Sequence, residues 1–136
     1  MLINERTGRP VATVVEVANT RAARNQGLLG REGLDASHAI VLSPCFSIHT
    51  AFMRFPIDVL FVDRDGCAVR IIPALTPWRL AVAMRARHVV EMAAGELLRS
   101  GVRVGDRLTL TTATGEVDER LWSPVPPADN GLRTPA

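Results

Sequence analysis

The side chains best suited to chemistry interrupt an otherwise apolar stretch between residues 49 and 63. His49, Arg54 and Asp58 are the polar residues that stand out there. A charge in apolar surroundings is unfavourable unless it is paired or contacts a ligand. Imidazole exchanges hydrogen bonds near neutral pH, guanidinium binds anions through a planar fork, and carboxylate accepts hydrogen bonds. The three residues therefore predict either a ligand-binding pocket or a structural network in which Asp58 pairs with Arg54 or Arg70.

Two nucleophilic side chains, Cys45 and Ser47, precede the histidine. On an extended strand with a rise of ~3.3 Å per residue, the Cα atom of Ser47 lies about 6.6 Å from that of His49, and the Cα atom of Cys45 lies about 13 Å from it. Neither spacing gives the direct hydrogen bond that a nucleophile and its base require, unless the chain bends or bulges. No Gly-x-Ser-x-Gly motif surrounds Ser47. A small hydrolase that uses Cys45 or Ser47 with His49 is therefore an alternative hypothesis; otherwise Cys45 is a small buried side chain.

Glu91 and Trp78 are two further candidates. Glu91 follows two valines, which predicts a carboxylate inside a strand that pairs with Arg87 or an arginine across the sheet, and less readily a general base. Convergence of Glu91 with Asp58 would create a two-carboxylate acid/base arrangement. Trp78 either plugs the end of a barrel or stacks over a planar ligand. The complete set of predicted ligand-binding residues is His49, Arg54, Asp58, Ser47, Trp78 and Glu91.

Composition narrows the class of protein. The 136 residues fit one domain, and 47% hydrophobic with 22% charged residues is typical of a folded chain. All sixteen basic residues are arginines, which excludes Schiff-base lysines and a P-loop lysine. The arginines are scattered without a run and the net charge is only +2, so we expect no nucleic-acid binding.

The cysteines and histidines show no metal-binding spacing. Cys45 and Cys67 form no CxxC motif and the three histidines lie far apart, so we predict no metal and no cofactor. The two cysteines are expected to be free thiols, with a disulfide between them as the alternative. The N-terminus shows no secretion signal, and no apolar segment is long enough to span a membrane. The chain as given is expected to be cytoplasmic, or periplasmic if the native start lies upstream.

Short apolar runs separated by turn residues predict a mainly β (α+β) domain, either a compact β-sandwich or a partly closed barrel. We expect about seven short strands and two short helices. One helix spans residues 21–26 after a cap at Asn19 or Thr20, and the other spans residues 95–100. The domain covers residues 1–113, and the proline-rich residues 114–136 are expected to form a flexible tail.

The sequence Asp-Arg-Asp-Gly at residues 63–66 predicts a tight hairpin turn. Pairing Asp63 with Cys67 across this turn places Leu60 opposite Arg70. It also places Asp58 diagonal to Arg70, within reach of the long arginine side chain.

Several blocks recur in the order found in one protein family. They are His49–Asp63, the turn that follows, Val89–Met92, Gly101–Asp106 and Gly27–Arg31. Over about residues 15–110 the chain resembles the DUF192 family of small prokaryotic proteins. A histidine there commonly precedes a methionine, a basic residue and a Pro-x-Asp step. The matching positions here are His49, Met53, Arg54, Pro56 and Asp58.

This resemblance implies a compact, mainly β domain in a family whose activity is not established. Our first hypothesis is a domain that binds a small-molecule ligand, an acidic metabolite or a glycan, in a polar pocket. A hydrolase and an accessory protein of an envelope or secretion process are the alternatives. Whether the protein is an enzyme stays open, and the sequence identifies no protein partner.

Overall fold

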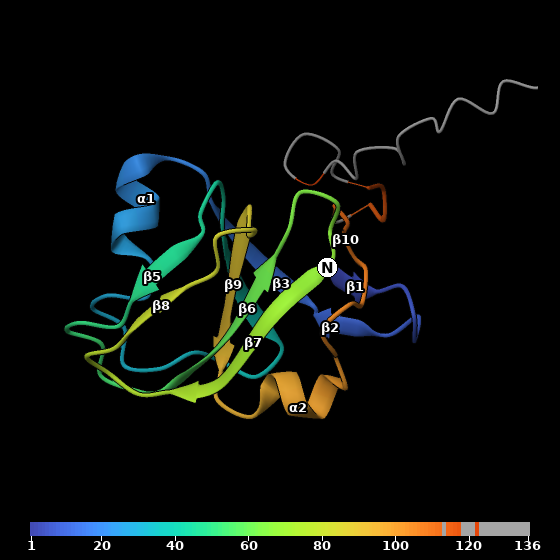
Figure 1. Ribbon diagram of the computed structural model, residues 1–136. Coiled ribbons are helices and arrows are strands. Elements are labelled where there is room, and N and C mark those ends of the chain that lie inside the picture. Colours follow the sequence, from blue (N-terminus) through green and yellow to red (C-terminus); the bar gives the residue numbers. More distant parts are fainter. Residues whose placement is uncertain (113, 118–121, 123–136) are drawn as a thin grey trace, which may run out of the picture.

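The computed structural model describes residues 1–112, 114–117 and 122, and over these residues it is built mainly from strands (Figure 1). Ten strands and two short helices are present there, which confirms the predicted mainly β class, although the sheets are not closed into a barrel. In chain order the elements are β1 Leu2–Asn4, β2 Pro10–Ala12, β3 Val14–Ala18, α1 Arg21–Gln26, β4 His38–Leu42, β5 Ser47–His49, β6 Ile57–Val62, β7 Ala68–Leu75, β8 Leu80–Val82, β9 His88–Ala93, α2 Glu96–Ser100 and β10 Leu108–Leu110.

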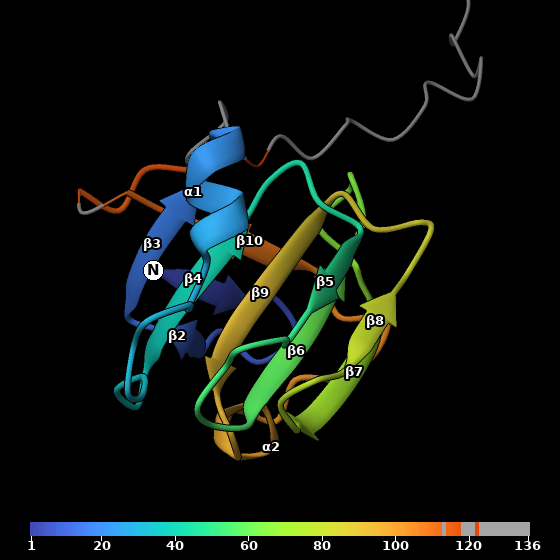
Figure 2. The ribbon, with the colours of Figure 1, turned by 90° about the vertical axis from the view of Figure 1, so that its left-hand side faces the viewer.

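The fold has a five-stranded sheet in its middle, with the strand order β3-β4-β9-β6-β7. β3 and β4 pair in parallel and are connected through α1, whereas the other neighbours are antiparallel. The three-stranded sheet β10-β1-β2 and α2 lie on one side of this sheet. On the other side lie α1 and a two-stranded ribbon of β5 and β8 (Figure 2). Among the described residues, no helix is long and apolar enough to span a bilayer.

Alternate residues of the middle strands enter two separate hydrophobic cores. On β6, Leu60 and Val62 pack on the side of β1, β2 and β10. Val59 and Phe61 pack on the side of the ribbon, together with Ile48 of β5. Because neighbouring residues of a strand point to opposite faces, a strand that is covered on both sides reads as a continuous apolar run. All six residues of β6 are accordingly buried.

The predicted turn at residues 63–66 forms. Farther from the turn, the register between the two strands of the hairpin differs from the predicted register by one residue. A bulge leaves Val69 of β7 unpaired, so Arg70 lies opposite Phe61 and not opposite Leu60. A bulge adds one residue to one strand only, and alternation of residue types does not reveal it.

A buried histidine connects the middle sheet to the end of the described chain. Nδ1 of His88 lies 2.7 Å from the hydroxyl oxygen of Ser43, and its ring stacks on Trp122 at a centroid distance of 4.4 Å. The indole N–H of Trp122 donates to the carbonyl of Leu108 at 2.8 Å. Most of the predicted tail at residues 114–136 lies outside the described residues, whereas Trp122 is a buried part of the core.

The contribution of His88 to the stability of the fold is expected to be lost between pH 6.5 and 4. Burial, assisted by the positive charge of Arg87, lowers the pKa of His88 from 6.5 to about 4. Over that range the unfolded chain binds a proton that the folded protein excludes, so the contribution of His88 to the free energy of unfolding falls with falling pH, by roughly 3 kcal/mol. In urea unfolding, the difference in free energy between a His88→Gln variant and the wild type should change over this pH range, and the difference between a His38→Gln control and the wild type should not. A difference for His88→Gln that does not change with pH would assign the acid sensitivity to other groups.

Candidate functional site

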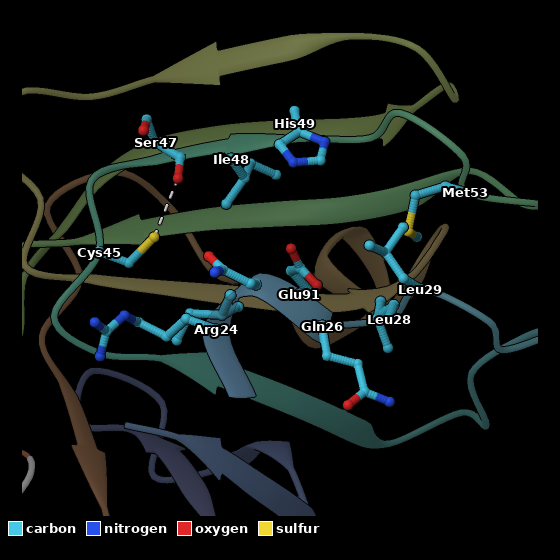
Figure 3. A pocket seen from close by; sticks show the side chains of 13 residues that line it. Arg24, Gln26, Leu28, Leu29, Cys45, Ser47, Ile48, His49, Met53 and Glu91 are labelled. Atoms are coloured by element: carbon cyan, nitrogen blue, oxygen red, sulfur yellow. Dashed lines mark hydrogen bonds between the residues drawn. The ribbon is translucent and has the colours of Figure 1, made fainter. Parts of the chain in front are cut away.

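A cavity of about 180 Å³ opens between α1, β5 and the middle sheet (Figure 3). Its walls come from three parts of the chain: the end of α1 and the turn after it, the segment from β4 to Met53, and β9. The apolar lining residues are Leu28, Leu29, Leu42, Ile48 and Met53, and the polar ones are Arg24, Asn25, Gln26, Cys45, Ser47, His49 and Glu91.

Glu91 is the buried acid of this cavity. It lies near the centre of β9, which pairs with β4 on one side and β6 on the other, and it is only 5% exposed. Its Oε2 atom has no hydrogen-bond partner among the described residues. Burial disfavours the charged carboxylate and raises the pKa of Glu91 to about 7. Near neutral pH the side chain can therefore be a hydrogen-bond donor or acceptor.

The end of α1 passes close to this carboxyl group. Thr20 caps the start of the helix, as its hydroxyl oxygen accepts from the backbone N–H of Ala23 at 3.1 Å. Gly27 ends the helix with φ +44°, and a Cβ atom at this position would lie 3.8 Å from Oε2 of Glu91. A backbone of this shape favours glycine. The predicted helix and cap are confirmed, and the glycine lets the backbone approach the buried acid.

Arg24 leaves the carboxyl group without a counter-charge. Its guanidinium donates to the carbonyl of Asn19 at 3.0 Å and, at 3.5 Å, to that of Ser43. In Figure 3 the guanidinium accordingly points away from Glu91. The predicted pairing of Glu91 with an arginine does not form among the described residues.

Cys45 faces the cavity as a thiol rather than a thiolate. Its Sγ donates to the backbone carbonyl of Ser47 at 3.1 Å. Burial raises the pKa of Cys45, and the negative charge of Glu91 adds to that effect. Catalytic cysteines need the opposite, a pKa lowered by nearby positive charge. This environment is therefore unfavourable for nucleophilic catalysis by Cys45.

Alkylation should report the coupling between Cys45 and Glu91. In a Cys67→Ser background, iodoacetamide is expected to modify Cys45 more slowly than a model thiol at pH 8, because the raised pKa of Cys45 lowers the thiolate fraction. A Glu91→Gln substitution removes the neighbouring negative charge and should accelerate the reaction. Glu32→Gln, at an exposed glutamate, is the control. Modification faster than the model thiol would contradict this description and restore the thiol-enzyme hypothesis.

Ser47 and His49 lie side by side along one edge of the cavity. Both belong to β5, whose pairing with β8 sets Ser47 opposite Val82 and His49 opposite Leu80. His49 is exposed, and the described hydrogen bonds include none between His49 and Ser47 or Cys45. Neither proposed nucleophile is thus activated by the histidine in this arrangement.

The structure separates the predicted ligand-binding residues. Ser47, His49 and Glu91 line the cavity, and Arg54, Asp58 and Trp78 do not. The Arg54 side chain is 65% exposed and lies 4.0 Å from Glu32. Trp78 is exposed and contacts Phe52 edge to face, with ring centroids 4.6 Å apart. The prediction that His49, Arg54 and Asp58 share one hollow is wrong.

The side chain of Asp58 lies on the opposite side of the middle sheet from the cavity. Its carboxylate, fully buried, accepts from the backbone N–H of Ala74 at 2.8 Å and from that of Leu97 at 2.9 Å. Asp58 pairs across the strands with Met92, one position along from Glu91. Adjacent strand residues point to opposite faces, so the two carboxylates cannot converge. The predicted pairings of Asp58 with arginine and with Glu91 are both wrong.

Sequence reasoning missed the contribution of α1 to the cavity. Arg24, Asn25 and Gln26 line it, yet the helix has no fully buried residue and only a weak apolar stripe. The one local signal was a glycine directly after a capped helix, which marked the helix end but not what lies beneath it. The described residues contain no group of three or more histidine, cysteine or acidic side chains placed to hold a metal ion.

Comparisons with known proteins agree on one family. Residues 2–110 match the DUF192 family, described as Uncharacterized ACR. A UPF0127 protein of Pyrococcus abyssi is 30% identical over 119 residues, which cover 82% of this chain and 98% of that protein. A UPF0127 protein of Pyrococcus furiosus is 41% identical over 63 residues, which are 46% of this chain and 53% of that protein.

Two solved structures share the fold. A protein of unknown function from Novosphingobium aromaticivorans superposes with a TM-score of 0.71 at 22% identity, covering 80% of this chain and 82% of the other. A protein from Sinorhizobium meliloti described as a "putative transcription regulator" gives a TM-score of 0.69 at 28% identity, with 79% and 88% covered.

Proposed function

Because the chain belongs to the DUF192 family of uncharacterised proteins, whose name specifies no activity, we propose a function from the cavity itself: the protein binds a small ligand that donates a hydrogen bond to Glu91. The unpartnered Oε2 atom of Glu91 is the observation that carries this proposal. A buried acceptor without a partner costs about 1–3 kcal/mol, and a ligand O–H or N–H group in the cavity would remove that cost.

The size and lining of the cavity limit the ligand. At about 180 Å³ it is smaller than the roughly 300–1,000 Å³ of pockets that hold drug-sized molecules. Leucine, isoleucine and methionine side chains supply apolar contact, while Ser47 and His49 offer polar groups at one edge. The cavity therefore suits a molecule about as large as a single sugar ring.

Charge favours a hydroxyl-rich ligand over an acidic one. The burial that raises the pKa of Glu91 leaves the carboxyl group partly ionised near pH 7, and a ligand carboxylate beside it would be repelled. Of the two ligand classes suggested by the sequence, a glycan fragment thus fits better than an acidic metabolite. The hydrolase alternative gains no support, because neither Cys45 nor Ser47 has an activating partner among the described residues.

Titration with a panel of monosaccharides and small dicarboxylic acids, monitored by amide NMR shifts, tests this proposal. We expect saturable shifts around residues 24–29, 47–49 and 91 with at least one monosaccharide, and none with the acids at pH 8. Glu91→Ala should weaken that binding about tenfold or more, because it removes the buried acceptor. Glu32→Ala, at an exposed glutamate, should not. No saturable shift at these positions, or tighter binding of the acids, would refute the proposal.

A further inference from the structure

The ribbon of β5 and β8 exposes a concentration of large apolar side chains. Its exposed residues Phe46, Phe52, Trp78, Leu80 and Met84, here called the ribbon face, lie on β8 or in the segments that flank the two strands. The exposed fractions of Leu80 and Met84 are 73% and 78%. Single exposed apolar residues are normal on a protein surface, but a group of this kind on one element marks an interaction site.

Backbone and ring contacts bring the members of the ribbon face together. The rings of Phe52 and Trp78 meet edge to face at one end of the ribbon. At the other end the N–H of Ala83 donates to the carbonyl of Phe46 at 2.9 Å, which places Phe46 beside the segment that carries Met84. Leu80 lies between these ends on β8, opposite His49 of β5. The apolar side chains therefore extend along the whole ribbon.

The ribbon is anchored from beneath, so its exposed residues are not needed for the core. Ile48 of β5 and Ala81 of β8 are directly paired, and both are buried in the core on that side of the middle sheet. Leu80 and Val82 flank Ala81 and so point the other way. Figure 1 shows the ribbon as a layer outside the middle sheet.

The two stretches of chain that contain the ribbon and its flanking segments carry no acidic side chain. Residues 36–57 and 66–90 contain no aspartate or glutamate but carry five arginines, Arg54, Arg70, Arg79, Arg85 and Arg87. All five are exposed. Among the described residues, Arg54 forms one ion pair, with Glu32 at 4.0 Å. No described acidic side chain forms an ion pair with the other four arginines. The small net charge of the whole chain conceals this asymmetry.

We propose that the ribbon face docks onto an anionic lipid surface. Trp78, Leu80 and Met84 enter the interfacial layer, while Arg79 and Arg85 contact lipid phosphates. Tryptophan and arginine both combine an apolar body with a polar group and suit the boundary between headgroups and acyl chains. Positive charge beside such apolar groups adds attraction to anionic lipids. This proposal rests on surface residues and is independent of ligand binding in the cavity.

The aliphatic members of the ribbon face favour lipid over the other polyanions. A single-stranded nucleic acid would use the arginines and stack its bases on Phe52 and Trp78, but it offers nothing to Leu80 and Met84. Lipid acyl chains would bury the side chains of Leu80 and Met84 away from water. Burial of a leucine side chain contributes substantially to the free energy of membrane binding.

Sedimentation with large unilamellar vesicles tests the proposal. The whole chain should bind vesicles of phosphatidylglycerol and phosphatidylcholine and should leave pure phosphatidylcholine vesicles unbound. Leu80→Ser should weaken binding about tenfold. The double variant Arg79→Gln/Arg85→Gln should weaken it by about fivefold for each arginine. Trp78 emission, obtained as the difference between the wild type and Trp78→Phe, should shift to the blue when vesicles are added.

Matched variants on other surfaces serve as controls. Leu98→Ser, at an 85% exposed leucine of α2, and Arg9→Gln/Arg103→Gln should leave vesicle binding unchanged. Thermal melting shows whether each variant is folded, and Met84→Ser replaces Leu80→Ser if the latter is not. The proposal is overturned if anionic vesicles do not bind the protein, or if the ribbon-face variants weaken binding no more than their controls. Binding to single-stranded RNA in preference to vesicles would overturn it as well.

Discussion

Replacing Asp58 by alanine is expected to lower the free energy of unfolding by about 4 kcal/mol. The two backbone N–H groups that its carboxylate binds, those of Ala74 and Leu97, would be left buried without an acceptor, at about 1–3 kcal/mol each, and the cavity adds to this. Both groups depend on Asp58 for local reasons. Ala74 has φ +47° within the second irregularity of β7, and the N-cap residue of α2, Gly95, makes no side-chain cap hydrogen bond.

Asp58 thus caps α2 and holds the irregular end of β7 from a strand of the middle sheet. Asp58→Asn, which keeps one carbonyl oxygen as an acceptor, should cost roughly half as much as the alanine variant. Asp35→Ala, at an exposed aspartate, should be neutral. Urea unfolding measures all three. A midpoint for Asp58→Ala equal to that of the wild type would show that water or a shifted backbone replaces the carboxylate.

Glu91→Gln is expected to stabilise the folded protein by about 3 kcal/mol above pH 7. Burial raises the pKa of Glu91 from 4.5 to about 7, so the folded protein holds a proton that the unfolded chain releases. Stability from this group is complete below pH 4.5 and is lost as the pH rises to about 7 and beyond. Glutamine is neutral throughout and suffers no such loss. The shift of the pKa converts to the stated energy at about 1.4 kcal/mol per unit.

The difference between Glu91→Gln and the wild type isolates this effect from that of His88. From pH 4.5 to 6.5 the two groups act in opposite directions, because His88 makes the fold more stable as the pH rises and Glu91 makes it less stable. Chemical denaturation at half-unit steps from pH 4 to 9 should give a difference near zero at low pH that grows through neutrality. A difference that does not change with pH would mean that Glu91 is ionised in the folded state.

The parts of the fold that local chemistry determines could be predicted from the sequence. Thr20 and Gly27 mark the two ends of α1 through a hydroxyl cap and a positive φ, and both signals lie within a few residues of the helix. The turn at residues 63–66 depends equally on local groups, since the carboxylate of Asp63 accepts from two backbone N–H groups nearby. The elements that carry their own start and stop signals were therefore located correctly.

The parts of the fold that depend on pairing between strands could not be predicted from the sequence. β8 has only three residues, and Leu80-Ala81-Val82 shows no alternation of residue types, so its sequence does not mark it as a strand. The bulge at Val69 has no signature in residue type and moved Arg70 out of its expected place. β8 is defined by its pairing with β5, which is distant in the sequence, whereas the bulge lies within the hairpin of β6 and β7; in both cases the pairing, and not the residue type, decides the structure.

The candidate site shows the same limit. Glu91 and Asp58 occupy similar positions in two apolar strands, and their sequence surroundings do not distinguish them. Only the register between β6 and β9 does so, because it sets Asp58 opposite Met92 and Glu91 opposite Val59. One carboxylate then meets backbone N–H groups and the other meets a cavity. The chemistry of each acid is decided by the face on which it lies.

The weak anchoring of α1 determines how a molecule would reach the buried acid. The helix spans six residues, buries none of them fully and forms one wall of the cavity. Segments with few buried side chains open at a much smaller free energy than the whole domain requires. Fraying of this helix would widen the way to Glu91 while both hydrophobic cores stay closed, so a bound molecule would exchange faster when this one peripheral turn opens.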